Sequence, residues 1–282
     1  MTDIVDVSFA CGGKANALVQ AGVSTVIRYY SRDTGLPAKR LTKAEAKQFA
    51  AAGLRLAAVH EARHGDRIES FTEALGQADA DYACQYAAEV IDQPAGSAIY
   101  FAVDLDVSKP QVAASVVPYF EGVAHGMAAA GRSYRVGVYG SGRTCAALLD
   151  KDLASLAWLC QSTGFADYQA FLASNRWALR QLAQATVAGL DCDPDAANPA
   201  VGDFGAFSPG GVIVTGPMTP MQVIARSGLH LRSGPGLEYP SLGLLPLGTR
   251  LLAGKTTGDW TLVDRLGDGA VDGFVNSHYL AP

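Results

Sequence analysis

Short apolar runs alternate with longer amphipathic stretches over the first 207 residues of this 282-residue chain. Runs of four to nine residues rich in β-branched and aromatic side chains predict buried strands. Eight such runs are found: Ile4–Ser8, Thr25–Ser31, Leu54–Glu61, Ala98–Asp106, Arg135–Ser141, Leu156–Ser162, Arg176–Gln181 and Ala188–Asp191. Strands separated by helices indicate parallel β-α-β units, and eight such units close into a (β/α)8 TIM-type barrel.

The helical stretches carry recognisable start and stop signals. Thr42, with Glu45 three residues later and Gly53 at the far end, predicts a capped helix. Longer helices are predicted over 70–91 and 110–131, and Pro118 inside the second predicts a kink or a break. The seventh connection, 182–187, is too short for a helix, so we expect a somewhat irregular barrel within an α/β fold.

The pattern changes after residue 207. Residues 208–220 are rich in Gly and Pro, which is typical of a linker. Residues 221–282 contain short alternating runs punctuated by glycines and almost no helical period, which predicts a small all-β barrel. We therefore expect a barrel over 1–207, a linker over 208–220 and a second domain over 221–282.

Composition and charge exclude several classes of function. The net charge of −5 argues against nonspecific nucleic-acid binding, and no apolar segment is long enough for a membrane span. The first residues do not read as a signal peptide, so we expect a protein that is cytoplasmic until it is released by phage lysis or exported by a non-Sec route. Five scattered cysteines without a C-x-x-C pair argue against structural zinc, and no cofactor is expected.

The run Ala98–Asp106 is the most informative segment, because it is apolar until it ends in Asp104 and Asp106. Residues two apart in a strand point to the same side, so both carboxylates are expected to project from the carboxyl end of a buried strand. α/β barrels hold their chemistry at that end. The alternative is a polar strand end or a helix N-cap. Three further acidic residues fall at carboxyl ends of predicted strands, and we expect all five carboxylates to converge: Asp6, Glu61, Asp104, Asp106 and Asp191.

The C-terminal part resembles a bacterial SH3-like domain almost end to end. The resemblance rests on the run that begins Leu229-His-Leu-Arg-Ser-Gly-Pro-Gly, on Gly258-Asp-Trp-Thr-Leu-Val and on Gly273-Phe-Val-Asn-Ser-His-Tyr-Leu. It implies binding to a cell-wall peptide or to a partner domain. Tyr239, Trp260 and Tyr279 are candidates for the binding surface, with core packing the preferred reading for Trp260.

The first 207 residues resemble a glycoside-hydrolase-like barrel domain, formerly of unknown function, that is related to the lysozyme-type muramidases of glycoside hydrolase family 25. The markers follow the predicted strands in order: Asp6-Val-Ser, Val26-Ile-Arg-Tyr-Tyr-Ser, Tyr100-Phe-Ala-Val-Asp-Leu-Asp, Val136-Gly-Val-Tyr-Gly-Ser, Trp158-Leu-Cys-Gln-Ser, Trp177-Ala-Leu-Arg-Gln and Gly189-Leu-Asp-Cys-Asp. The resemblance implies cleavage of peptidoglycan glycan by carboxylates at the barrel mouth.

The resemblance also implies roles for the acidic residues. Family 25 carries Asp-x-Glu on the fourth strand, with the Glu as general acid, whereas this chain has Asp104-Leu-Asp106 and a side chain one methylene shorter. Asp106, or the longer Glu61, is then the expected acid. Asp104 would orient the substrate's acetamido group or act as nucleophile, and Asp6 and Asp191, which match the family's acidic positions on the first and last strands, would tune the charge.

Four polar or aromatic residues near strand ends are expected to line a sugar groove, with barrel packing as the alternative: Tyr30, Tyr139, Trp158 and Gln181. Arg28 is expected either to pair with the acids or to bind sugar. Two other functions stay open. One is a catalytically inactive carbohydrate-binding barrel. The other is a metal-dependent hydrolase, because aspartates can hold a hard divalent cation.

Overall fold

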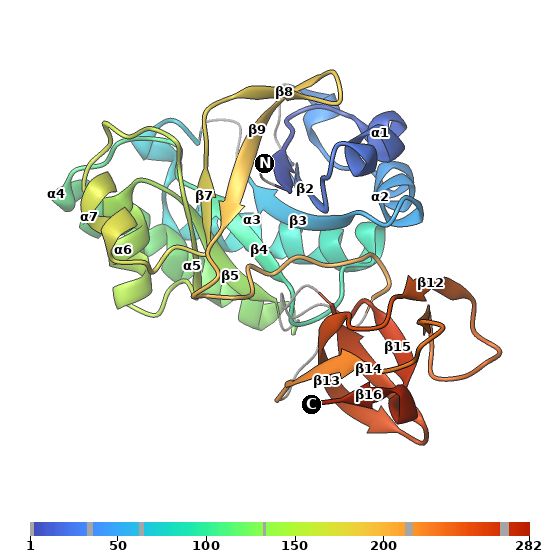
Figure 1. Cartoon of the computed structure of the whole chain (residues 1–282). Helices are drawn as coiled ribbons and strands as arrows, with labels where there is room; N and C mark the ends of the chain where they lie inside the picture. The colour runs from blue at the N-terminus through green and yellow to red at the C-terminus, as the bar shows by residue number, and fades with distance from the viewer. Residues whose placement is uncertain (1–2, 33–35, 62–64, 132–133, 212–216, 266–270) are drawn as a thin grey trace. The chain divides into compact units, whose positions relative to one another are not determined.

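The computed structural model describes residues 3–32, 36–61, 65–131, 134–211, 217–265 and 271–282, and Figure 1 traces the chain. The chain divides into two compact units, Met1–Gly210 and Gly211–Pro282. Part of the expected linker, 212–216, lies outside the described residues, and the first strand of the second unit begins at Thr219, inside the range expected for the linker.

The first unit is built on an eight-stranded closed barrel. Seven strands follow one another in parallel: β1 (Ile4–Asp6), β2 (Thr25–Tyr29), β3 (Arg55–His60), β4 (Ala98–Ala102), β5 (Arg135–Gly140), β6 (Leu156–Leu159) and β7 (Leu179–Gln181). β9 (Leu190–Ala197) closes the barrel by pairing with both β7 and β1, and it is antiparallel to both. The expectation of eight parallel strands is therefore wrong for the last strand.

A β-hairpin explains the reversed direction of the last strand. The short connection after β7 cannot form a helix, and it forms β8 (Ala185–Val187), which pairs antiparallel with the first half of β9. Ala188 and Gly189 make the turn and both have positive φ, +53° and +74°. Positive φ at both central residues characterises the two-residue turns that match the twist of a hairpin. In Figure 1 this hairpin rises above the barrel.

Helices cover the outside of the barrel. They are α1 (Ala15–Gln20), α2 (Lys43–Ala51), α3 (Glu73–Gln85), α4 (Lys109–Gln111), α5 (Val117–Ala129), α6 (Gly142–Asp150) and α7 (Tyr168–Ala173), with α3 continued by a π-helical turn, Tyr86–Ile91. The side chain of Thr42 caps α2 as predicted, accepting a hydrogen bond from the Glu45 N–H. Short 3₁₀ turns lie at Gly12–Lys14, Pro37–Lys39 and Ile68–Ser70.

The irregularity expected near Pro118 is present. A π-helical stretch, Val112–Val116, joins α4 to α5 just before this proline. Proline lacks the N–H that would bond to the carbonyl four residues back, and its ring crowds that carbonyl, so the preceding turn widens.

The barrel interior is packed at one end and hollow at the other. Inward-facing residues include Ile27, Tyr29, Tyr100 and Trp158, and they pack with Phe204 and Ala206 from the segment after the barrel. The Tyr100 hydroxyl donates to the Phe204 carbonyl over 2.8 Å, and Phe207 pairs with Leu56 at the start of β3. This segment closes the amino ends of the strands, so the open end is the carboxyl end.

The second unit is a seven-stranded antiparallel sheet around its own apolar core. Its strands are β10 (Thr219–Val223), β11 (Leu229–Arg232), β12 (Ser241–Leu245), β13 (Arg250–Thr257), β14 (Trp260–Asp264), β15 (Gly273–Asn276) and β16 (Leu280–Ala281), in the order β12-β11-β15-β14-β13-β10-β16, with one 3₁₀ turn at Ser277–Tyr279. Val223, Val263 and Val275 are fully buried at its centre. Within the described ranges, no helix of the chain has the length and apolar character to cross a bilayer.

Ala188→Gly is expected to stabilise the first unit by about 1 kcal/mol, because a left-handed backbone strains any residue with a Cβ. Urea unfolding of the two proteins measures the difference. Ala185→Gly on the adjoining strand is the control and should destabilise, because that position has ordinary strand geometry. A loss of stability in Ala188→Gly would show that the turn is not strained.

Candidate active site

A polar cavity of about 340 Å³ lies at the carboxyl ends of the barrel strands. Among the described residues, its walls combine four carboxylates, one lysine, aromatic rings and amide or hydroxyl groups. The lining residues are Asp6, Ser8, Tyr29, Lys39, Val59, Glu61, Ala102, Asp104, Tyr139, Trp158, Gln161, Ser162, Gln181 and Asp193. Six of the ten residues expected at the site are therefore brought together: Asp6, Glu61, Asp104, Tyr139, Trp158 and Gln181.

Asp6 is the most buried carboxylate of this cavity, with 4% of its surface exposed. Its Oδ2 accepts a hydrogen bond from the Tyr29 hydroxyl over 2.9 Å and a longer one, 3.3 Å, from Gln181 Nε2. Its Oδ1 is buried, and no donor from the described residues reaches it. Burial raises the pKa of Asp6 to about 7, helped by the nearby Asp193 and opposed by the Tyr29 hydrogen bond.

Two further carboxylates from β9 adjoin Asp6. Asp193 lines the cavity, and Asp195 is fully buried, with its Oδ1 accepting from Trp158 Nε1 over 2.7 Å. Burial raises the pKa of both groups, and the Asp6 charge adds to the effect on Asp195. Three aspartates on two neighbouring strands thus share one poorly solvated region.

The Gln181 amide joins this acidic cluster to the aromatic wall. Its Oε1 accepts from the Tyr139 hydroxyl over 2.8 Å and from the Gln161 N–H over 3.4 Å. Its Nε2 donates to Oδ2 of Asp6 and to Oδ2 of Asp193. The rings of Tyr139 and Trp158 meet edge to face, with centroids 4.7 Å apart. The amide is therefore oriented by its partners, with its nitrogen toward the carboxylates.

A second pair of carboxylates, Glu61 and Asp104, follows the ends of β3 and β4. Glu61 forms an ion pair of 2.6 Å with Lys39 Nζ, which also lies 4.4 Å from the centroid of the Tyr29 ring. Asp104 is exposed at the cavity rim. Partial desolvation and then the Glu61 charge raise its pKa.

Asp106 does not line the cavity, contrary to expectation. Its side chain is exposed, and its Oδ1 accepts a hydrogen bond from the Ala166 N–H over 2.9 Å, which fixes the loop before α7. β4 ends at Ala102, so the two-residue alternation no longer holds at position 106. Ser108, with Gln111, caps the following helix.

Asp191 also lies outside the cavity lining. It is exposed on the β8–β9 hairpin and accepts from Thr186 Oγ1 over 2.9 Å. Because β9 is antiparallel, its amino end lies at the mouth and its alternate residues descend into the barrel. Asp193 therefore lines the cavity in its place, with Asp195 buried two residues further along β9, and neither was predicted from the sequence.

Arg28 and Tyr30 face outward from β2 rather than into the barrel. The Arg28 guanidinium is fully buried against α2, pairs with Glu45 at 3.1 Å and donates to the carbonyls of Ala38 and Lys39. The Tyr30 hydroxyl donates to Gln93 over 2.7 Å. The intervening residue, Tyr29, is the one that lines the cavity.

A metal centre was one of the open alternatives. Among the side chains that the structure describes, no three His, Cys, Asp or Glu residues are grouped closely enough to hold a metal ion. The carboxylates of the cavity are instead divided between the Asp6 side and the Glu61 side.

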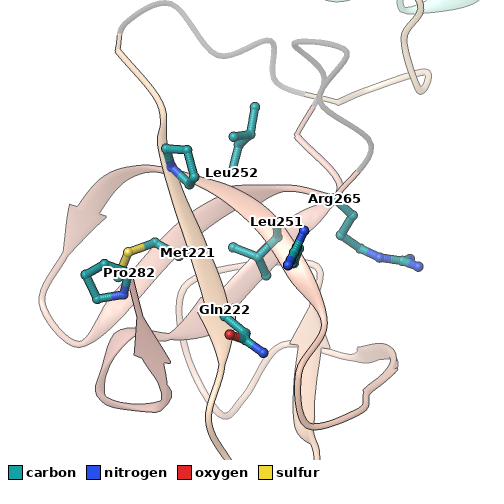
Figure 2. Close-up of a pocket in the computed structure, with 8 residues that line it drawn as sticks. Met221, Gln222, Leu251, Leu252, Arg265 and Pro282 are labelled. Carbon is teal, nitrogen blue, oxygen red and sulfur yellow. The ribbon is translucent and has the colours of Figure 1, made fainter. Parts of the chain in front are cut away.

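The second unit has a separate cavity of about 480 Å³, shown in Figure 2. It is lined by Pro220, Met221, Gln222, Arg250, Leu251, Leu252, Arg265 and Pro282. The aromatic candidates lie elsewhere: Tyr239 and Tyr279 are 40% and 50% exposed, and neither borders this cavity. Trp260, for which packing in the core was the preferred reading, is half-buried and lies outside the apolar core.

Asp6→Asn is expected to change how stability depends on pH. The folded-state pKa of Asp6, about 7, exceeds its ordinary value of 3.8, so the folded protein holds a proton that the unfolded chain releases between these values. Stability from this group is therefore lost as pH rises toward 7, by an amount on the order of a few kcal/mol. Denaturant unfolding measures the free energy of unfolding of both proteins at pH 4 and pH 8. The difference, variant minus wild type, should be more positive at pH 8 than at pH 4. Asp191→Asn, as a control, should follow wild type, and equal pH dependence in all three proteins would contradict the burial effect.

The barrel is similar to proteins of known sequence or structure. Over 177 residues it is 28% identical to the Bacillus subtilis protein FadG, a match that covers 62% of this chain and 30% of FadG. The chain thus spans less than a third of that relative. The Mycobacterium tuberculosis Tat-secreted protein Rv2525c, solved in complex with HEPES, matches 72% of this chain and 97% of its own, with a TM-score of 0.58 and 21% identity. A family GH25 lysozyme from Aspergillus fumigatus matches 68% of this chain and 92% of its own, with a TM-score of 0.43 and 13% identity.

Two family models cover most of the chain. Residues 16–196 match the Rv2525c-like, glycoside hydrolase-like domain, and residues 227–281 match the bacterial SH3 domain. The first match includes most of the barrel and all the carboxylates of its cavity except Asp6. The chain therefore belongs to the family of Rv2525c-like, glycoside hydrolase-like domains and carries a bacterial SH3 domain after the barrel.

Proposed function

We propose that this chain is a cell-wall glycan hydrolase of the muramidase type. The observation that supports this best is the pair Glu61 and Asp104 at the cavity rim: Lys39 pairs with the first carboxylate, and the second has a raised pKa. Hydrolysis of a glycosidic bond requires one protonated acid and one anionic carboxylate beside the bond. The two neighbouring strand ends offer that combination.

In the proposed reaction Asp104 is the general acid. Its raised pKa favours the protonated form, and its exposed position lets it meet the leaving oxygen of a bound glycan. Glu61, held by Lys39, is the anion that stabilises the oxocarbenium-like centre or activates the attacking water. These roles differ from those suggested by the family 25 pattern, in which the residue at position 106 would be the acid.

The rest of the cavity suits a sugar. The partly exposed ring of Tyr139, backed by the buried Trp158, supplies an apolar surface for the carbon–hydrogen groups of a pyranose ring. Gln161, Ser162 and Ser8 add hydrogen-bonding groups at the rim for hydroxyl groups. The bacterial SH3 domain is proposed to hold the enzyme on the cell wall by binding its peptide.

A carbohydrate-binding protein without hydrolytic activity is the second candidate. Asp106 stands where family 25 has its acid, and here its carboxylate binds the Ala166 N–H outside the cavity. Lys39 also forms an ion pair with Glu61, which would hinder the approach of the Glu61 carboxylate to a substrate. The two candidates predict the same ligand and differ only in whether the bond is cut.

Asp104→Asn is expected to reduce glycan cleavage on the order of 10²- to 10⁴-fold while the glycan still binds, because the amide cannot donate the acid proton. Release of reducing ends from purified peptidoglycan measures the rate. Wild-type activity should fall as pH rises through the raised pKa of Asp104, because the acid is then deprotonated.

Asp106→Asn is the matched control, with the same chemical change two residues away, and its rate should stay near that of wild type. If Asp106→Asn abolishes cleavage and Asp104→Asn does not, the assignment of the acid is wrong. If the wild type releases no ends but binds the glycan, the binding protein is the correct function.

A chain ending at Gly210 is expected to cleave short soluble glycans at the wild-type rate but to lose binding to intact cell walls. The two units have separate apolar cores, so removing one leaves the other intact. Sedimentation with purified walls measures binding, and equal sedimentation of both chains would exclude a wall-targeting role for the SH3 domain.

A further inference from the structure

The buried side of the cavity has more hydrogen-bond acceptors than donors. Asp6, Asp193 and Asp195 present six carboxylate oxygens. The donors that reach them are the Tyr29 hydroxyl, the two N–H groups of the Gln181 amide and the Trp158 indole N–H. Oδ1 of Asp6 and Oδ2 of Asp195 are buried and receive no donor from any residue in the described ranges.

The charges show the same imbalance. Four carboxylates from the described part of the chain line the cavity, and Asp195 lies buried beside Asp6 and Asp193. Among the described residues that line the cavity, Lys39 is the basic one, and its ammonium forms an ion pair with Glu61. Among the described residues, Lys39 therefore offsets only part of the negative charge that Asp193 and, once ionised, Asp6 bring to this side.

We propose that the cavity binds a glycan containing free amino groups, that is, a de-N-acetylated amino sugar, with its ammonium group against Asp6 and Asp193. This proposal rests on the proposed function and specifies its substrate. A primary ammonium offers three N–H donors and a positive charge, and Asp6, which lines the cavity, has a buried Oδ1 that no donor from the described residues reaches.

An N-acetylated sugar would fit this side less well. An acetamide provides one N–H donor but brings a carbonyl oxygen, and a carbonyl beside several carboxylates repels them. The two side chains that donate hydrogen bonds beside Asp6 and Asp193, Tyr29 and Gln181, already donate to these aspartates and are not available to an acetamide carbonyl there. The donor count thus favours the amine over its acetylated form.

Binding of an ammonium should also release protons. Without a cation beside it, Asp6 is kept protonated by its burial and by Asp193, with a pKa of about 7. The charged groups that act on it are Asp193 and Glu61, which favour the proton, and Lys39, which opposes it. A ligand ammonium adds a positive charge next to Asp6, lowers its pKa and displaces the proton to the solvent.

The test compares a fully de-N-acetylated glucosamine tetramer with its N-acetylated counterpart, using the full-length protein near pH 6. Isothermal titration calorimetry in two buffers of different ionisation enthalpy gives both affinity and protons released. The amino oligosaccharide is expected to bind about tenfold tighter or more, with proton release that the acetylated one does not cause. Asp6→Asn should lose most of this preference and the proton release, and Asp191→Asn, outside the cavity, should keep both.

Equal or tighter binding of the N-acetylated tetramer overturns the inference while leaving the proposed function in place. Binding of neither tetramer contradicts both. If calcium chloride alone causes the same proton release as the amino tetramer, the inference is overturned in favour of a cation site. If Asp6→Asn does not fold, Asp193→Asn replaces it, and the wild-type comparison by itself still decides the question.

Discussion

The alternation of side chains in a closed barrel is the constraint on which the site depends. Each strand directs every second residue inward, so the interior is filled by a fixed subset of each strand. On β4 this subset is Ala98, Tyr100 and Ala102, and it leads directly to Asp104 at the rim. On β9 the same rule places Asp195 below Asp193, because the strand runs in the opposite direction. The acidic cluster is therefore a product of register and strand direction.

The outward-facing residues serve the site indirectly. Arg28 and Glu45 form a buried ion pair between β2 and α2, and Glu45 also accepts from the Cys11 N–H. The same guanidinium binds the carbonyls of Ala38 and Lys39, which fixes the backbone of the residue whose ammonium reaches Glu61. A buried ion pair contributes little net stability when both charges must be desolvated, but it fixes geometry. Here it connects the loops after β1 and β2 to helix α2 beside the barrel mouth.

Sequence patterns predicted the strands of the barrel well. They predicted the site residues correctly only where these residues end or directly follow a regular parallel strand. Asp6, Glu61, Asp104 and Gln181 follow or end regular parallel strands, and all four line the cavity. β2 is buried on both faces, so its hydrophobicity carries no information about which side points inward. Arg28 and Tyr30 were therefore expected at the site, whereas Tyr29 between them lines the cavity. The expected position of Asp191 was wrong for another reason, because the turn at Ala188 and Gly189 reverses the chain. A hairpin with a two-residue turn can be recognised in a sequence only when its turn residues are distinctive.

The acidic cluster is costly for the folded protein, and this cost bears on its purpose. Burying Asp6 and Asp195 without enough donors destabilises their charged forms, which is why burial raises the pKa of each. A purely structural role would be better served by amides of the same shape, because these bring donors of their own. The arrangement becomes favourable when a ligand supplies what the barrel lacks, namely positive charge and N–H donors at the same point. The unpaired oxygen of Asp6 thus connects the stability of the barrel to the occupancy of its cavity.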